Sequence, residues 1–281
     1  MINAAALLRH DFGETTHCWD RRDAILYALG VGMGHDPMDR EDLRYLDERE
    51  LSVLPSMAVT LASPGMWIRN PKFGITFGKL VHSAQSARFA NPLPPEGTVV
   101  GTARVTSLTD RGEGKGAVLV LERTIRDAAD GTEYCRLEQT LLLRGDGGFG
   151  GPPASHTEGL IPETEPHCSQ SLPVSPRAAL IYRLSGDWNP LHLDPDFAQT
   201  AGFPRPILHG LASYAMAGIV VSRALGKNAA RVCQLACRFS GVVLPGDKLR
   251  FDIWHDGAKA RFQAFVDTRK VLDAGAIEWS D

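Results

Sequence analysis

An acid, an amide and an imidazole fall within six residues in the second half of this 281-residue chain: Asp187, Asn189 and His192. Gly186 and Pro190 interrupt the segment, which argues against one continuous helix. The three polar side chains can therefore converge from a compact loop. A carboxylate and an imidazole held against one small molecule suit acid–base chemistry, because imidazole titrates near neutral pH.

A second polar element, His209-Gly210, comes directly before the apolar run Leu211–Leu225. If a helix begins at Leu211, the backbone N–H groups near Gly210 have no partner inside it and carry the positive end of its dipole. Such N–H groups can stabilise an oxygen that becomes negative during a reaction. Gly210 could instead only let the chain and the helix pack closely. His209 could face a ligand or brace the loop.

The run Tyr182–His192, together with Ile207-Leu208-His209-Gly210, resembles the MaoC-like, or hydratase 2, family of (R)-specific enoyl-CoA hydratases. An acid, any residue, Asn-Pro, any residue and His form a specific pattern when His-Gly follows downstream. The likeness extends over most of the chain. It implies reversible addition of water to a trans-2-enoyl-CoA, which gives the (R)-3-hydroxyacyl-CoA. Coenzyme A is then part of the substrate, and no separate cofactor is expected.

The resemblance also implies roles for these residues. Asp187 and His192 would hold the attacking water, and the Gly210 N–H would stabilise the enolate-like thioester oxygen. Asn189 would orient the water, although it could simply start the turn before Pro190. Which of Asp187 and His192 is the base stays open, and they can share the duty as a coupled pair.

The fold implied by the resemblance is α+β: a double hotdog, two repeats of a long helix wrapped by an antiparallel sheet. The residues themselves indicate a duplication, because three short segments recur in the same order at offsets of 155, 154 and about 150. The matching segments are Tyr27-Ala28-Leu29-Gly30 with Tyr182-Arg183-Leu184-Ser185, Leu54-Pro55-Ser56-Met57-Ala58 with Leu208-His209-Gly210-Leu211-Ala212, and Ala87-Arg88-Phe89 with Cys237-Arg238-Phe239.

The duplication predicts a non-catalytic hotdog-like domain at 1–145, a Gly- and Pro-rich linker at 146–173 and a catalytic domain at 174–281. In the first domain the catalytic positions are taken by Gly32, Pro37 and Pro55-Ser56, so one site per chain is expected. The first domain's helix is predicted to be shortened near Ser63-Pro64-Gly65. The space this leaves is predicted to bind substrate through apolar side chains: Met57, Val59, Leu61, Met66 and Trp67.

Strand and helix patterns accompany this plan. Leu211–Leu225 is apolar nearly all round, which is typical of a buried helix. Asp130-Gly131 is a hairpin signal between two strand-like runs. The predicted strands are Ala117–Arg126, Thr132–Leu143, Leu249–Trp254, Arg261–Val266 and Ala274–Trp279.

Positive charge near the Pro245-Gly246 turn comes from Arg238, Lys248 and Arg250. These side chains could belong to a solvated strand edge or could contact coenzyme A phosphates. Asp194 and Asp196 lie beside His192 but flank a proline, a pattern that starts helices, so no metal site is expected.

Composition excludes several classes of protein. The chain is 43% hydrophobic and 22% charged, which is globular, and its formal charge of -3 does not favour nucleic acid as a partner. Its five cysteines lack C-x-x-C spacing, which suits a reducing compartment. The longest apolar stretch is too short for a membrane helix. We therefore expect a cytoplasmic protein that binds neither membrane nor nucleic acid. The resemblance implies that it acts on acyl-CoA thioesters, and we expect a homodimer.

Two alternatives stay open. A hotdog thioesterase would use its carboxylate to drive water onto the thioester carbonyl. A non-catalytic acyl-CoA-binding protein would not need Asp187 and His192, and both are present.

Overall fold

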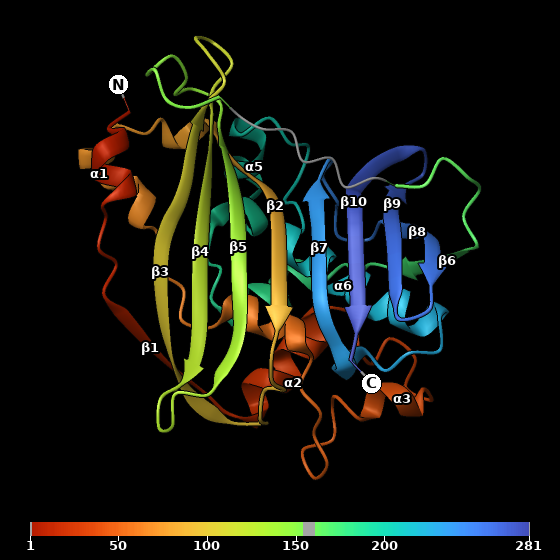
Figure 1. The fold of residues 1–281 in the computed structure, drawn as a ribbon. Coiled ribbons are helices and arrows are strands. Elements are labelled where there is room, and N and C mark those ends of the chain that lie inside the picture. The colour runs from red at the N-terminus through yellow and green to blue at the C-terminus, as the bar shows by residue number, and fades with distance from the viewer. Residues whose placement is uncertain (1, 154–160, 281) are drawn as a thin grey trace.

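The computed structural model describes residues 2–153 and 161–280, which form a single antiparallel sheet with helices on one face (Figure 1). The strands are β1 (Glu14–Trp19), β2 (Leu80–Phe89), β3 (Gly97–Asp110), β4 (Ala117–Asp127), β5 (Glu133–Leu143), β6 (Cys168–Pro173), β7 (Val232–Phe239), β8 (Lys248–Asp256), β9 (Lys259–Val266) and β10 (Arg269–Trp279). The α-helices are α1 (Ala4–Leu8), α2 (Arg21–Gly30), α3 (Arg40–Leu43), α4 (Ala178–Tyr182), α5 (Pro195–Thr200) and α6 (Gly210–Ala224). The 3-10 helices are η1 (Pro55–Thr60), η2 (Trp67–Arg69), η3 (Pro71–Phe73), η4 (Phe77–Lys79), η5 (Arg183–Ser185), η6 (Pro190–His192) and η7 (Ala229–Arg231).

The order of the strands confirms the duplication. It runs β1-β3-β4-β5-β2-β7-β10-β9-β8-β6, so the second five strands repeat the first five in reverse. At the centre β2 pairs with β7, where Ser86 lies opposite Ala236. These two residues are 150 positions apart, the offset found between the repeats. A pseudo-twofold axis therefore passes through this pair and relates the two halves.

Only the second half has a long central helix. All but the ends of α6 is buried, because the sheet of its own half curves around it and the other half closes the remaining side. In the first half the equivalent segment is the six-residue η1. Two residues after its end, Ala62 has a φ of 44°, and Pro64 lies two residues further on, so the helix cannot continue. The predicted shortening is confirmed, and the long helix expected of each repeat is present in one.

The space beside η1 is filled, contrary to the predicted apolar pocket. Met57, Val59 and Leu61 are at most 3% exposed and belong to the main hydrophobic core. The Arg123 side chain reaches in from β4 and donates to the Val59 and Leu61 carbonyl oxygens at 2.7 and 2.8 Å. This guanidinium satisfies carbonyls that a longer helix would have bonded internally. Met57 is therefore a core residue in this structure.

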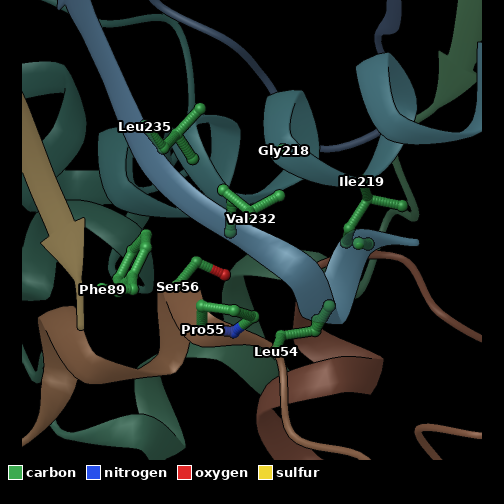
Figure 2. Close-up of a pocket in the computed structure, with 10 residues that line it drawn as sticks. Leu54, Pro55, Ser56, Phe89, Gly218, Ile219, Val232 and Leu235 are labelled. Atoms are coloured by element: carbon green, nitrogen blue, oxygen red, sulfur yellow. The ribbon is translucent and has the colours of Figure 1, made fainter. Parts of the chain in front are cut away.

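A small cavity of about 10 Å³ remains between η1 and α6 (Figure 2). Its walls are apolar apart from the Ser56 hydroxyl, which points into it. Gly218 and Ile219 of α6 form the facing wall. A volume of about 10–15 Å³ accommodates one water molecule.

The predicted linker at 146–173 is shorter in the structure. At its start the Asp146 carboxylate accepts hydrogen bonds from the Thr76 amide and hydroxyl, which attaches this part to the first half. Its last six residues form β6, which pairs with β8 in the second half. Residues 154–160 of the predicted linker lie outside the described residues.

The five predicted strands are confirmed as β4, β5, β8, β9 and β10, with Gly131 at a φ of 76° in the hairpin turn between β4 and β5. Strands β1, β2, β3, β6 and β7 were not predicted, because none of them alternates cleanly between apolar and polar residues. No helix in the described part of the chain is long and apolar enough to cross a membrane.

Candidate active site

The loop that carries Asp187 and His192 is built by three local features. Gly186, with a φ of 110°, ends the helical turn of η5 in a left-handed conformation that favours glycine. Pro190 then starts η6, and the Asn189 side-chain oxygen caps it by accepting from the Leu191 amide at 3.1 Å. The local sequence thus turns the chain twice within six residues and places Asp187 and His192 on one side.

The segment that leads into α6 holds the His192 side chain in place. Its Nδ1 lies 2.9 Å from the Ile207 carbonyl oxygen, and because a carbonyl only accepts, Nδ1 carries the proton. The other nitrogen, Nε2, is then free to accept or donate a proton. The side chain is 7% exposed, so this nitrogen acts in a largely dry environment.

Asp187 lies beside this imidazole. One carboxylate oxygen of Asp187, one ring nitrogen of His192 and one ring nitrogen of His209 all lie within 4.8 Å of one another. The Asp187 carboxylate is exposed, and it accepts from the Asn189 amide at 3.2 Å. The predicted convergence of acid and imidazole is therefore present.

Gly210 is the first residue of α6, one position before the predicted start. The segment Ile207-Leu208-His209 approaches in an extended conformation, with the Leu208 amide bonded to the Val243 carbonyl oxygen. A Cβ at Gly210 would lie 3.3 Å from the Phe239 ring, so glycine lets the helix start pack against β7. The same position leaves the first N–H groups of the helix without intrahelical acceptors. The packing interpretation of Gly210 is therefore confirmed, and the stabilisation of a negative oxygen by its N–H stays a prediction that this packing leaves possible.

The His209 side chain is buried behind Asp187 and His192. It is 1% exposed, its Nε2 lies 3.3 Å from the Asp187 carbonyl oxygen, and its ring stacks on that of His192 at 3.6 Å between centroids. Of the two roles left open, it braces the loop.

Arg238 and Lys248 are not brought to this group. Arg238 is on the sheet face opposite to α6, since its neighbour Cys237 is buried, and it pairs with Asp273 at 2.6 Å. Lys248 begins β8, and two strands lie between β7 and β8 in the sheet. Arg250 pairs with Asp252 at 3.2 Å. The solvated strand edge describes these cations better than a shared phosphate site.

Burial controls the protonation of both histidines. It lowers the pKa of His192 below the ordinary 6.5, although the Ile207 carbonyl and Asp187 oppose the effect. Burial and, second, the neighbouring His192 lower the pKa of His209 to about 3. Two imidazolium rings stacked at 3.6 Å would repel each other strongly. At neutral pH the pair is therefore uncharged and His192 can take up a proton.

The sequence interpretation missed two contributors to the site. Tyr182 packs against His209 with 4.9 Å between ring centroids, whereas the sequence indicated no role for it beyond the family resemblance and the repeat. His82, from the first half, packs against Phe239 with 5.0 Å between ring centroids. The charge of Asp187 raises the pKa of His82, although burial has the larger, opposite effect. The repeat itself was a signal for Tyr182, since it matches Tyr27. No sequence pattern pointed to His82.

Comparison with known proteins agrees with this geometry. Residues 158–276 match the MaoC like domain, and residues 17–145 match the MFE-2 hydratase 2 N-terminal domain. An enoyl-CoA hydratase of Mycobacterium tuberculosis is 37% identical over 257 residues, which cover 89% of this chain and 88% of that protein. The peroxisomal enoyl-CoA hydratase 2 of Arabidopsis thaliana is 35% identical over 99% of this chain and 95% of its own length. The crystal structure of a MaoC-like dehydratase from Phytophthora capsici superposes with a TM-score of 0.84 at 29% identity, covering 100% of this chain and 99% of that one.

The sheet of two related halves and the single polar group at the start of α6 define a double hotdog protein of the dehydratase type. The chain belongs to the MaoC-like dehydratase family and carries the hydratase 2 arrangement of two such domains.

Proposed function

We propose that this chain is a hydro-lyase, an (R)-specific enoyl-CoA hydratase that adds water reversibly to trans-2-enoyl-CoA. The observation that carries the proposal is the meeting of the Asp187 carboxylate and the His192 imidazole beside the N-terminus of α6. The Nε2 of this imidazole is left free, because Nδ1 is bonded to the Ile207 carbonyl oxygen. Family membership supports it, since relatives at 37% and 35% identity are named enoyl-CoA hydratases.

The mechanism follows from what each group can offer. Asp187 and His192 Nε2 hold one water between them, and one of the two removes its proton as the oxygen attacks C3. A proton is delivered to C2 on the same face, so both new bonds form on one side of the double bond. Each positioned acid–base group contributes about 10²–10⁴ in rate.

The thioester oxygen becomes negative as the enolate forms, and the Gly210 N–H is directed to stabilise it. A single such donor contributes about 10²–10³ in rate. Asn189 has its side-chain oxygen committed to the Leu191 amide. Its NH₂ group is the part that can orient the water, so the structural and catalytic roles of Asn189 are compatible.

Crotonyl-CoA tests this function against its rivals. We expect loss of the enoyl absorbance without free thiol, and a stereospecific dehydrogenase should oxidise only the (R) product. Release of free thiol would instead indicate a thioesterase. No change in either signal would indicate a non-catalytic acyl-CoA-binding protein, and (S) product would contradict the family mechanism.

We also propose that the chain is a homodimer. Large apolar side chains are exposed along the segment that carries Asp187, and a partner would cover them: Leu180, Leu184, Trp188, Leu193 and Phe197 are each 43–57% exposed. Surface patches of this kind are typical of interfaces. Light scattering of the purified chain tests the dimer, and a monomer at micromolar concentration would refute it. The cytoplasmic location remains a prediction, and fluorescence imaging of the tagged chain would check it.

A further inference from the structure

We propose that His209 is a positioning residue for Asp187 and His192, and that a buried chain of tyrosines holds it in one tautomer. The inference rests on the proposed hydration at that pair and deepens it. It also replaces the expectation that His209 binds substrate, because a side chain that is 1% exposed does not reach a ligand.

His209 touches both members of the pair. Its Nε2 lies 3.3 Å from the main-chain oxygen of Asp187, and its ring supports the His192 ring at 3.6 Å with an angle of 25° between planes. A small shift of His209 would therefore change the distance between the acid and the imidazole.

These contacts require one tautomer. The Asp187 carbonyl accepts only, so His209 Nε2 carries the proton and Nδ1 needs a donor. Nδ1 is buried and has no hydrogen-bond partner among the described protein atoms. An imidazole with the proton on Nδ1 would turn a lone pair toward the Asp187 oxygen and push that loop away.

Tyrosine hydroxyls are available to supply this donor. Tyr182 packs beside His209 at 4.9 Å, and Tyr27 packs beside Tyr182 at 5.8 Å. The hydroxyls of Tyr182 and Tyr27 are also buried without a protein partner. Leaving a buried polar group unpaired costs about 1–3 kcal/mol. No direct hydrogen bond joins these three groups. They lie on adjacent rings, so an internal water, which needs two to four polar partners, connects them in this proposal.

The far end of this chain belongs to the non-catalytic half. Tyr27 and Tyr182 are equivalent residues of the two repeats, and α2 and α4 meet so closely that a Cβ on Gly30 would lie 3.0 Å from the Tyr182 Cα. Beyond Tyr27 lies Ser56, the counterpart of Gly210, whose hydroxyl faces the small cavity (Figure 2). The first half thus contributes to the site by holding His209.

Histidine-labelled ¹⁵N NMR of the full chain at pH 7 tests the tautomer without relying on activity. We expect His192 to be protonated on Nδ1 and His209 on Nε2, with resonances assigned through His192→Gln and His209→Gln. Tyr182→Phe and Tyr27→Phe should give a mixture of His209 tautomers. Tyr134→Phe is the matched control, because that hydroxyl donates to Asp127 in the β4–β5 hairpin at 2.9 Å. A wild-type His209 protonated on Nδ1 would overturn the proposal.

Kinetics give the second measurement. His209→Phe keeps the ring but loses the donor, and it should lower kcat by about 10²-fold with KM changed only a few-fold, because small misplacements of reacting groups cost that much. His209→Gln keeps a donor and should recover part of the loss in kcat. His255→Phe, at an exposed position of β8, should leave kcat and KM unchanged. Unchanged kcat in His209→Phe, or a rise in KM alone, would contradict the positioning role. If the wild type proves inactive as a hydratase, the proposed function fails, while the tautomer measurement still decides the role of His209.

Discussion

Replacing the two groups of the Asp187–His192 pair, singly and together, tests whether they act as one unit. Asp187→Asn and His192→Gln each keep the size of the side chain and remove its proton-transfer capacity. Each should lower kcat by about 10² or more, which corresponds to about 2.7 kcal/mol in the activation barrier. The two side chains lie within 4.8 Å of each other. In the proposed mechanism they hold the same water, so losing either one disables the same step. The double variant should therefore lose about as much as one single variant, and not the product of about 10⁴.

The assay follows the enoyl absorbance of crotonyl-CoA at saturating substrate, with folding checked by circular dichroism. Asp194→Asn is the control for the acid, since the Asp194 side chain caps α5 and asparagine can cap equally well. His255→Gln is the control for the histidine. Single variants with near wild-type turnover would refute the assignment. A double variant whose loss equals the product would refute the shared water.

Three further outcomes follow from the structure. A fragment of residues 166–281 should aggregate and show little activity per site, because β7 loses its partner β2 and α6 loses half of its cover; a soluble, fully active monomer would rule this out. Met57→Ala should destabilise the fold by about 2–5 kcal/mol in urea unfolding while KM stays unchanged, and the reverse result would make Met57 a substrate contact. Stability should fall as pH drops from 6.5 toward 4, since burial lowers the pKa of His82, His192 and His209 and the unfolded chain binds their protons first. The slope should be about 1.4 kcal/mol per pH unit for each proton, and a flat urea-unfolding profile over this range would contradict it.

Local spacing was enough to predict that Asp187 and His192 lie close together. Gly186 and Pro190 restrict the backbone only locally. The turn that brings Asp187 toward His192 is therefore determined by a few adjacent residues. The apolar run after Gly210 predicted α6 for the same reason. The hairpin at Asp130-Gly131 likewise depends only on adjacent residues. Short-range features of this kind need no knowledge of the rest of the chain.

The duplication carried the prediction further. Short segments recur in the two halves at an offset of about 150, which indicated equivalent elements. The pairing of β2 with β7 at Ser86 and Ala236 has this offset. It also indicated that the first half lacks the catalytic residues. It could not show what replaces the missing helix, because Arg123 reaches Val59 and Leu61 from a strand more than sixty residues away.

Only the tertiary structure decided how the site is supported. His209 stacks on His192, and Tyr27 meets Tyr182 across the two halves, through contacts between segments that are far apart in sequence. Arg238 looked like a phosphate ligand until the sheet placed Asp273 next to it and turned both away from α6. Packing between distant elements determines which polar groups are buried, which are neutralised and which stay free to react. The residues proposed to perform chemistry could therefore be located from the sequence, whereas those that hold them in place depend on how the two halves fold against each other.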